Sequence, residues 1–205
     1  MVSVLSRPAV SAPPVRLPLG QSVLLDPGLR PSGTCLEVIE GVARVYCPCE
    51  ETEGMTLAFV QAGDQLRTDR LCSEGVCVEA LTPLVFRTDA EPCAAVGFDA
   101  VNEWTLQLLR IRHLGQAEQR LHALLALLVS RLGRRCGNWC DLPFRLTHER
   151  IGELIGTTRV TTTRLISRIR AERLIEVPAG STHMRLAPAL VENAPVSGGH
   201  LYPIG

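Results

Sequence analysis

Two short amphipathic patterns that meet at a glycine constrain this chain more than any other part of its sequence. Residues 146–156 (LTHERIGELIG) place Thr147 at a position suited to a helix N-cap, and their apolar residues share one face at helical spacing: Ile151, Leu154 and Ile155. Gly156 can end this helix and permit a sharp turn, and Thr158 is the N-cap candidate for a second helix. Two short helices joined by a tight, glycine-containing turn predict a helix-turn-helix.

The second helix of this motif begins with an unusual mixture of short polar residues and arginines, GTTRVTTTRL. At about 100° per residue, three of its residues fall on one side and are expected to pack inward: Thr162, Leu165 and Ile169. The complementary, outward-facing arc contains Arg159, Val160, Thr163, Arg164 and Ser167. Such a face suits a DNA major groove, because Arg159 and Arg164 can bind guanine edges and Val160 can touch a thymine methyl group.

Two short extended runs, LIEV and HMRLA, follow this helix on either side of Pro178-Ala179-Gly180-Ser181. They predict a hairpin, and a hairpin directly after a helix-turn-helix is typical of a winged helix. Candidate phosphate contacts are the wing residues and the hydroxyl groups of the motif: His183, Arg185, Thr147, Thr158 and Ser167. The alternative is a small helical domain whose arginines form a solvated face.

Charge is distributed unevenly, although the formal net charge of the chain is zero. Residues 1–105 contain 7 arginines and 14 acidic residues, whereas residues 106–205 contain 14 arginines and 7 acidic residues. This asymmetry indicates an acidic module joined to one that faces nucleic acid or phosphate. The chain contains no lysine, so arginines, hydroxyl groups or backbone N–H groups would have to bind phosphates. We therefore expect double-stranded DNA as a partner.

The N-terminal half has the pattern of short β-strands. Between residues 17 and 97, runs rich in valine, leucine and aromatic residues alternate with turn residues. Glu40-Gly41 separates two of these runs in the manner of a tight hairpin. Strands at this spacing predict a small antiparallel sandwich or jelly roll, and the helices that follow make the chain α+β. Residues 1–16 lack the features of a signal peptide, and we interpret them as a flexible arm.

A helical pattern replaces the strands at residues 98–115. Four apolar residues follow the 3-4-3 spacing of a coiled-coil seam: Val101, Trp104, Leu108 and Ile111. This spacing predicts a dimerisation helix; the alternative is an amphipathic helix packed on its own domain. Another helix is expected at residues 116–132, with Gly133 as its stop, so that residues 116–188 form the winged-helix domain. Residues 189–205 are expected to form a disordered tail.

The stretch RLTHERIGELIGTTRVTTTRLISRIRAERLIEV resembles the DNA-binding region of the family of the cyclic-AMP receptor protein and the fumarate–nitrate reduction regulator. Within it, GTTRVTTTRL is most similar to the recognition helix of the global nitrogen regulator, and IEGVARVY and AGDQL resemble fragments of the family's β-roll. The resemblance implies a transcription regulator with a shortened, cyclic-nucleotide-binding-like jelly roll. It implies a homodimer on a palindromic site, with Arg159, Val160 and Arg164 at the base-reading positions. RNA polymerase is a further candidate partner.

The roll departs from the cyclic-nucleotide-binding members of this family. In those members, a Gly-Glu motif is followed by an Arg-Ser/Thr pair that holds the cyclic phosphate. The corresponding stretch, GDQLRTDRLCSEGVCVEALTP, has no such pair, and Arg67 and Arg70 do not match its spacing. We therefore predict a regulator that does not depend on cyclic AMP, with an unidentified effector or none.

Eight cysteines leave a second kind of regulation open. The chain has no stretch of about 18 apolar residues and no signal peptide, so we expect it to be cytoplasmic, where thiols are reduced. Cys47-Pro-Cys49 and the pair Cys72 and Cys77 could instead bind a metal or an iron–sulfur cluster, although neither spacing is a strong ligand pattern. The sequence assigns no cofactor, and a cysteine-based redox- or metal-sensing regulator is the first alternative function.

Catalytic motifs do not stand out. The sequence contains no P-loop, no G-x-S-x-G and no H-E-x-x-H. We therefore expect a protein that is not an enzyme. A protein-binding adaptor with a vestigial helix-turn-helix is the second alternative function.

Overall fold

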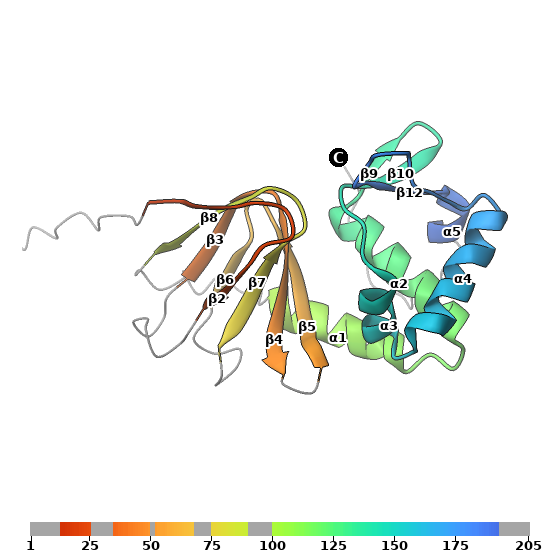
Figure 1. Ribbon diagram of the computed structural model, residues 1–205, viewed down its shortest axis with the longest axis horizontal. Helices are drawn as coiled ribbons and strands as arrows, with labels where there is room; N and C mark the ends of the chain where they lie inside the picture. The colour runs from red at the N-terminus through yellow and green to blue at the C-terminus, as the bar shows by residue number, and fades with distance from the viewer. Residues whose placement is uncertain (1–12, 26–34, 50–51, 68–74, 90–99, 193–205) are drawn as a thin grey trace, which may run out of the picture. The chain divides into compact units, whose positions relative to one another are not determined.

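The computed structural model describes residues 13–25, 35–49, 52–67, 75–89 and 100–192. The chain forms two compact units, Met1–Trp104 and Thr105–Gly205, and each has its own fold (Figure 1). Within the described ranges, no helix is long and apolar enough to cross a membrane.

The first unit is a jelly roll of two four-stranded antiparallel sheets. One sheet has the strand order β1-β8-β3-β6, and the other has the order β2-β7-β4-β5. The strands are β1 Val15–Leu17, β2 Ser22–Leu25, β3 Cys35–Glu40, β4 Val42–Cys49, β5 Thr52–Gln61, β6 Gln65–Arg67, β7 Val76–Ala80 and β8 Leu84–Asp89. Alternation along the strands buries apolar residues such as Val45, Val78 and Phe86. The predicted jelly roll is confirmed.

The break at Gly41 is not the tight hairpin that the sequence predicted. β3 ends at Glu40 and β4 begins at Val42, yet the two strands belong to different sheets. Gly41 has a φ of 92°, and an added Cβ atom would lie 2.2 Å from the carbonyl oxygen of Pro83. The backbone therefore passes from one sheet to the other at a point where only glycine fits.

The N-terminal boundary of the roll also differs from the prediction. Val15 and Arg16, which we assigned to the flexible arm, belong to β1 and pair antiparallel with β8. This pairing provides backbone hydrogen bonds for the edge of that sheet. Residues 1–12 and Arg70 lie outside the described residues, and Arg67 is the last residue of β6.

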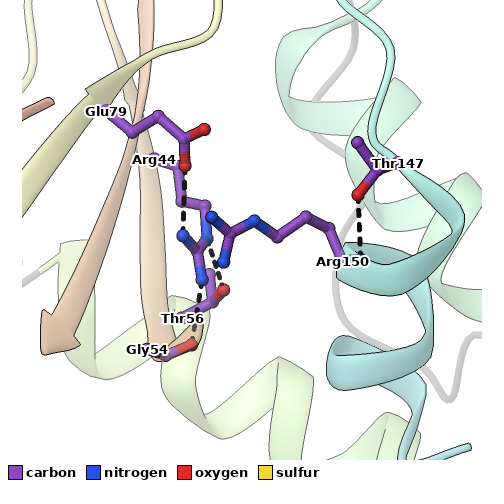
Figure 2. A network of polar contacts seen from close by, with 6 residues as sticks. All are labelled: Arg44, Gly54, Thr56, Glu79, Thr147 and Arg150. Carbon is purple, nitrogen blue, oxygen red and sulfur yellow. Dashed lines mark hydrogen bonds and ion pairs between the residues drawn. The ribbon is translucent and has the colours of Figure 1, made fainter. Parts of the chain in front are cut away.

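A buried arginine connects three strands of the second sheet. Arg44 of β4 is 1% exposed and donates hydrogen bonds to Thr56 Oγ1 at 2.7 Å and to the carbonyl oxygen of Gly54 at 3.0 Å (Figure 2). Its Nη1 lies 3.1 Å from Glu79 Oε2 in β7, and its guanidinium lies 4.2 Å from the ring centroid of Tyr46. These partners compensate for the hydration that a buried charge loses.

Helix α1, Ala100–Arg112, contains the predicted seam. The four seam residues are already buried within a single chain: Val101, Trp104, Leu108 and Ile111. Trp104 packs edge-to-face against Phe59 of β5, with ring centroids 5.3 Å apart. In contrast, Leu106 and Leu109 are 59% and 51% exposed. The seam pattern therefore marks the face that packs within the chain, and it offers little surface to a second chain.

The second unit is a winged helix-turn-helix. Its main helices are α2 Ala117–Leu132, α3 His148–Ile155 and α4 Arg159–Ala171. Strands β11 Ile175–Glu176 and β12 Met184–Leu186 pair antiparallel and form the predicted wing hairpin. Gly133 caps the end of α2, as the sequence predicted.

Strands β9 Arg134–Cys136 and β10 Trp139–Leu142 were not predicted. β10 pairs with both β9 and β12 in a sheet of order β11-β12-β10-β9. Gly137, with a φ of 59°, provides the left-handed turn between the two strands. The Gly-Asn dipeptide between two short runs was the available sequence signal.

The first residues of the expected disordered tail belong to a helix. Pro188–Glu192 forms helix α5, whose Leu190 is 3% exposed and which contacts α2. Burial of this leucine stabilises the packing of α5 on α2. Residues 193–205 lie outside the described residues.

Candidate nucleic-acid interface

The turn between α3 and α4 is built by two threonine caps and one left-handed glycine. Thr147 Oγ1 accepts a hydrogen bond from the backbone N–H of Arg150 at 3.2 Å (Figure 2). Thr158 Oγ1 accepts one from the backbone N–H of Thr161 at 3.2 Å. Gly156 lies between them with φ 64° and ψ 51°. Both predicted N-caps are confirmed, and α4 begins immediately after the turn.

Helix α4 buries one face and exposes the other. Thr162, Ile166 and Ile169 are buried, whereas Leu165, which we expected to pack inward, is only partly buried. All members of the predicted outward arc are exposed: Arg159, Val160, Thr163, Arg164 and Ser167. Val160 is 61% exposed, which leaves an apolar side chain facing solvent between charged neighbours. The whole arc is accessible to a partner.

His148 connects the start of α3 with the exposed face of α4. Its Nδ1 lies 2.9 Å from Thr163 Oγ1, and that hydroxyl donates to the carbonyl oxygen of Arg159 at 2.8 Å. Because the hydroxyl proton is already used, Nδ1 carries the proton of the neutral imidazole. Burial and the nearby cations of Arg170, Arg145 and Arg159 lower the pKa of His148 below its ordinary value. The positive field of three arginines therefore converges near the start of α3.

A hollow of about 680 Å³ lies between the C-terminal end of α4 and the wing. Its lining includes Arg145, Arg170 and Arg173, the indole of Trp139, and residues 175–181, among which Glu176 is acidic. The three arginine side chains are exposed, and within the described part of the chain none of them forms an ion pair. Several guanidinium groups around one hollow form an arrangement suited to phosphate.

The two predicted wing contacts differ in their surroundings. His183 is exposed, and its backbone N–H donates to Ser181 Oγ at 2.9 Å. Arg185 is paired instead, with its Nε 3.4 Å from Asp141 Oδ1 on β10. A phosphate would have to compete with this carboxylate for Arg185, whereas the arginines of the hollow form no ion pair among the described residues.

The cysteines differ from the expectation of reduced thiols at one position. Cys35 is disulfide-bonded, whereas Cys47, Cys77, Cys136 and Cys140 are free. Sequence spacing could not reveal this bond, because the geometry that it requires arises only in the fold. The side chains of Cys49, Cys72 and Cys93 lie outside the described residues. Among the residues that are described, no group of three or more His, Cys, Asp or Glu could hold a metal ion.

Sequence reasoning did not single out Arg145, Arg170 and Arg173. They come from the segment before α3, from the end of α4 and from the residues just after it. No periodic pattern relates them, because they line one hollow only after α4 and the wing have packed. The density of arginines in LISRIRAER was the only signal in the sequence.

Comparisons with known proteins place both units in one family. Residues 15–101 match the family model for the cyanobacterial CRP family N-terminal domain, and residues 119–190 match the model for the Crp-like helix-turn-helix domain. The regulatory protein CysR of Synechococcus elongatus is 30% identical over 183 residues, which cover 87% of this chain and 84% of CysR. The global nitrogen regulator of Nostoc sp. is 33% identical over 75 residues, which cover 37% of this chain and 32% of that protein.

Solved structures share the fold. FixK2 from Bradyrhizobium japonicum has a TM-score of 0.67 at 15% identity, covering 93% of this chain and 100% of that chain. A CRP-family transcriptional regulator from Thermus thermophilus has a TM-score of 0.65 at 19% identity, covering 92% of this chain and 98% of that chain. With a family-type domain in each unit and CysR similar along most of its length, the chain belongs to the Crp/Fnr family of transcription regulators with a DNA-binding helix-turn-helix.

Proposed function

We propose that this regulator binds a palindromic DNA site as a homodimer and reads its sequence with α4. The observation that carries this proposal is the exposed face at the start of α4, where Val160 is 61% exposed beside Arg159. An exposed valine between arginines is poorly suited to water but well suited to the major groove, where methyl groups and guanine edges lie side by side. Arg159 and Arg164 would bind guanines, and Val160 would touch a thymine methyl group.

Phosphates on either side of the base contacts would fix the position of α4. Thr147 and Thr158 lie at the starts of α3 and α4, and Ser167 lies on the same exposed face as the base contacts. Thr163 would act partly through His148, because its hydroxyl is already hydrogen-bonded. The hollow beside the wing would take a further phosphate between Arg145, Arg170 and Arg173, and His183 would contribute from the wing. These contacts would position the protein without specifying sequence.

The dimer would form through the exposed side of α1. Leu106 and Leu109 are one turn apart and more than half exposed, and Asn102 and His113 extend the same stripe at seam spacing. We therefore assign the dimer contact to this stripe and no longer to the four buried residues of the predicted seam, Val101, Trp104, Leu108 and Ile111. Two α4 helices related by the dimer axis would enter successive major grooves about 34 Å apart.

The regulator would act without cyclic AMP. The stretch between β6 and β8 lacks the Arg-Ser/Thr pair that holds a cyclic phosphate in nucleotide-binding members of the family. The proposal therefore assigns the sequence-specific binding to the winged helix and assigns no cyclic nucleotide to the roll.

Selection from a random duplex library tests this function. The purified protein at physiological salt should select two inverted half-sites about one helical turn apart. Arg164→Ala should keep the spacing but relax one base pair in each half-site, losing about 1–3 kcal/mol of discrimination. Arg110→Ala, which removes an exposed arginine from α1, should leave the consensus unchanged. An unchanged consensus with Arg164→Ala would refute the base-reading assignment, and no consensus for the wild type would favour an adaptor.

A further inference from the structure

The last residue of α1 contacts the end of α3. Arg112 donates from Nε to the carbonyl oxygen of Leu154 at 3.3 Å and from Nη2 to the carbonyl oxygen of Glu153. Both carbonyl groups belong to the final turn of α3, immediately before Gly156. Arg112 and α3 lie in the same unit of the chain, Thr105–Gly205.

These carbonyl groups need a partner from outside their own helix. The last four carbonyl groups of a helix have no intrahelical donor, and the C-terminal end carries a partial negative charge. Helix α3 has no basic residue in its own last turn. The N–H of Gly156 donates to Glu153 O at 3.4 Å, a long hydrogen bond. The guanidinium of Arg112 therefore provides the cation and the donors that α3 lacks.

The same guanidinium lies next to the turn that leads into α4. A Cβ atom added to Gly156 would have Arg112 Nε as its nearest neighbour, at 3.9 Å. Two residues later, Thr158 begins α4 as its N-cap. A second arginine fixes the loop between α1 and α2, because Arg120 Nη1 in α2 donates to the carbonyl oxygen of Leu114 at 3.2 Å. The end of α1 is thus tied to the turn between the two helices of the motif.

We propose that Arg112 is a positioning residue that makes the orientation of α4 follow the orientation of α1. The inference rests on the proposed function, in which α1 forms the dimer and α4 reads the half-site. Arg112 contacts no base in this scheme; it fixes the separation and angle of the two α4 helices in the dimer. Spacing between half-sites is therefore the property that it controls, whereas the base sequence of each half-site is read by Arg159 and Arg164.

The chain provides a matched control in the same helical turn. Arg110 is exposed and has the same charge, but within the described residues its side chain makes no hydrogen bond or ion pair. Arg112→Ala and Arg110→Ala therefore change the net charge equally and differ in the contact with α3. Arg112→Lys keeps the charge but replaces the two-pronged donor with a single ammonium group.

The test measures DNA affinity on duplexes with the selected half-sites at the preferred spacing, at spacings changed by one or two base pairs, and as a single half-site. Arg112→Ala should bind the preferred spacing about tenfold more weakly than wild type, the effect of losing a hydrogen bond from a charged group. It should bind the single half-site as wild type does and discriminate less between spacings. Arg112→Lys should be intermediate, and Arg110→Ala should match wild type.

Two results would overturn the inference. Arg112→Ala could behave as Arg110→Ala does on every duplex, or it could lose affinity equally for the dimeric site and the single half-site. If wild type itself binds none of the duplexes, the proposed function fails. Hydrogen exchange then tests separately whether Arg112 stabilises the turn between α3 and α4. Arg112→Ala should raise exchange at the amides of Gly156 to Thr158 relative to Arg110→Ala, and equal exchange would refute the link.

Discussion

At the scale of single residues, Arg173 has a backbone conformation that arginine rarely adopts. Among the described residues it is the one non-glycine residue with a positive φ, and that angle is 57°. Its N–H donates to the carbonyl oxygen of Arg170 at 3.0 Å, and Leu174 N–H donates to that of Ile169 at 3.1 Å. This arrangement ends a helix and usually has glycine at the position of Arg173. The side chain of Arg173 lines the hollow beside the wing. The proposed phosphate contact would explain why arginine, rather than glycine, occupies this position.

We predict that Arg173→Gly stabilises the protein and weakens DNA binding. Relief of the left-handed conformation should raise the free energy of unfolding by about 1 kcal/mol. Loss of the guanidinium should lower the slope of log K against log salt by about 0.9 per lost phosphate contact. Urea unfolding and DNA titration at several salt concentrations measure the two effects. Arg173→Ala is the control, since it should weaken DNA binding equally without the gain in stability; a less stable glycine variant would contradict the prediction.

His148 should make both stability and DNA binding depend on pH. Its pKa is lower in the folded protein than in the unfolded chain, so below about pH 6.5 the unfolded chain binds more protons. The free energy of unfolding should therefore fall as pH drops from 7.5 to 5.5. A DNA phosphate would offset the field of Arg170 and Arg145 and favour the protonated ring, so DNA affinity should rise over the same interval.

His148→Asn separates this effect from that of other titrating groups. The asparagine amide can still donate to Thr163 Oγ1, which His148 Nδ1 contacts at 2.9 Å, but it cannot take up a proton. Chemical unfolding and DNA titration at pH 7.5 and 5.5 should show weaker pH dependence in the variant. The same pH dependence in both proteins would show that His148 does not couple to phosphate.

At the scale of elements, the sequence predicted helices more accurately than strand pairing. Caps and helical period are local, so Thr147, Gly156 and Thr158 marked the bounds of α3 and α4 correctly. Pairing is not local: β3 pairs with β8 and β6, not with β4 beyond Gly41, and the order of residues in a short run does not specify its partner. For α1, the period identified the buried face, but period alone does not tell whether the same chain or a second chain covers it.

The exposed stripe of α1 gives a prediction at this scale. Leu106→Glu combined with Leu109→Glu should convert the dimer into a monomer, because each buried leucine contributes about 1.5–3 kcal/mol per chain when it is fully covered. Sedimentation equilibrium measures the change. Gln107→Glu adds a carboxylate to the same helix on a different face and should remain dimeric. A double variant that stays dimeric would place the interface elsewhere.

At the scale of the whole molecule, the two units divide the charge between them. The half that contains the roll has an excess of acidic residues, and the half that contains the winged helix has an excess of arginines. The sequence therefore indicated which half would face DNA before any element was placed. It did not indicate the hollow or the disulfide of Cys35, because both depend on residues that approach one another only after folding. It did not single out the stripe on α1, because packing decides which face of that helix stays exposed.

The disulfide of Cys35 separates the proposed function from a redox-sensing one. Cys35 begins β3, which lies between β8 and β6 in its sheet. Reduction should therefore destabilise the first unit, by about 2–4 kcal/mol if the bond is typical. Under the proposed function, α2, α3 and α4 should keep their hydrogen exchange rates, and DNA affinity should change by less than about twofold.

Hydrogen exchange and DNA titration with and without a reductant, on wild type, Cys35→Ala and Cys77→Ala, decide between these functions. Cys35→Ala should reproduce the effect of reduction on the roll, whereas Cys77→Ala removes a free, half-buried thiol and should behave as wild type. If the reductant instead changes DNA affinity by about tenfold in wild type and Cys77→Ala but not in Cys35→Ala, the bond controls DNA binding. The roll would then act as the redox sensor of the regulator, because reduction of the Cys35 disulfide would change DNA binding by the winged helix.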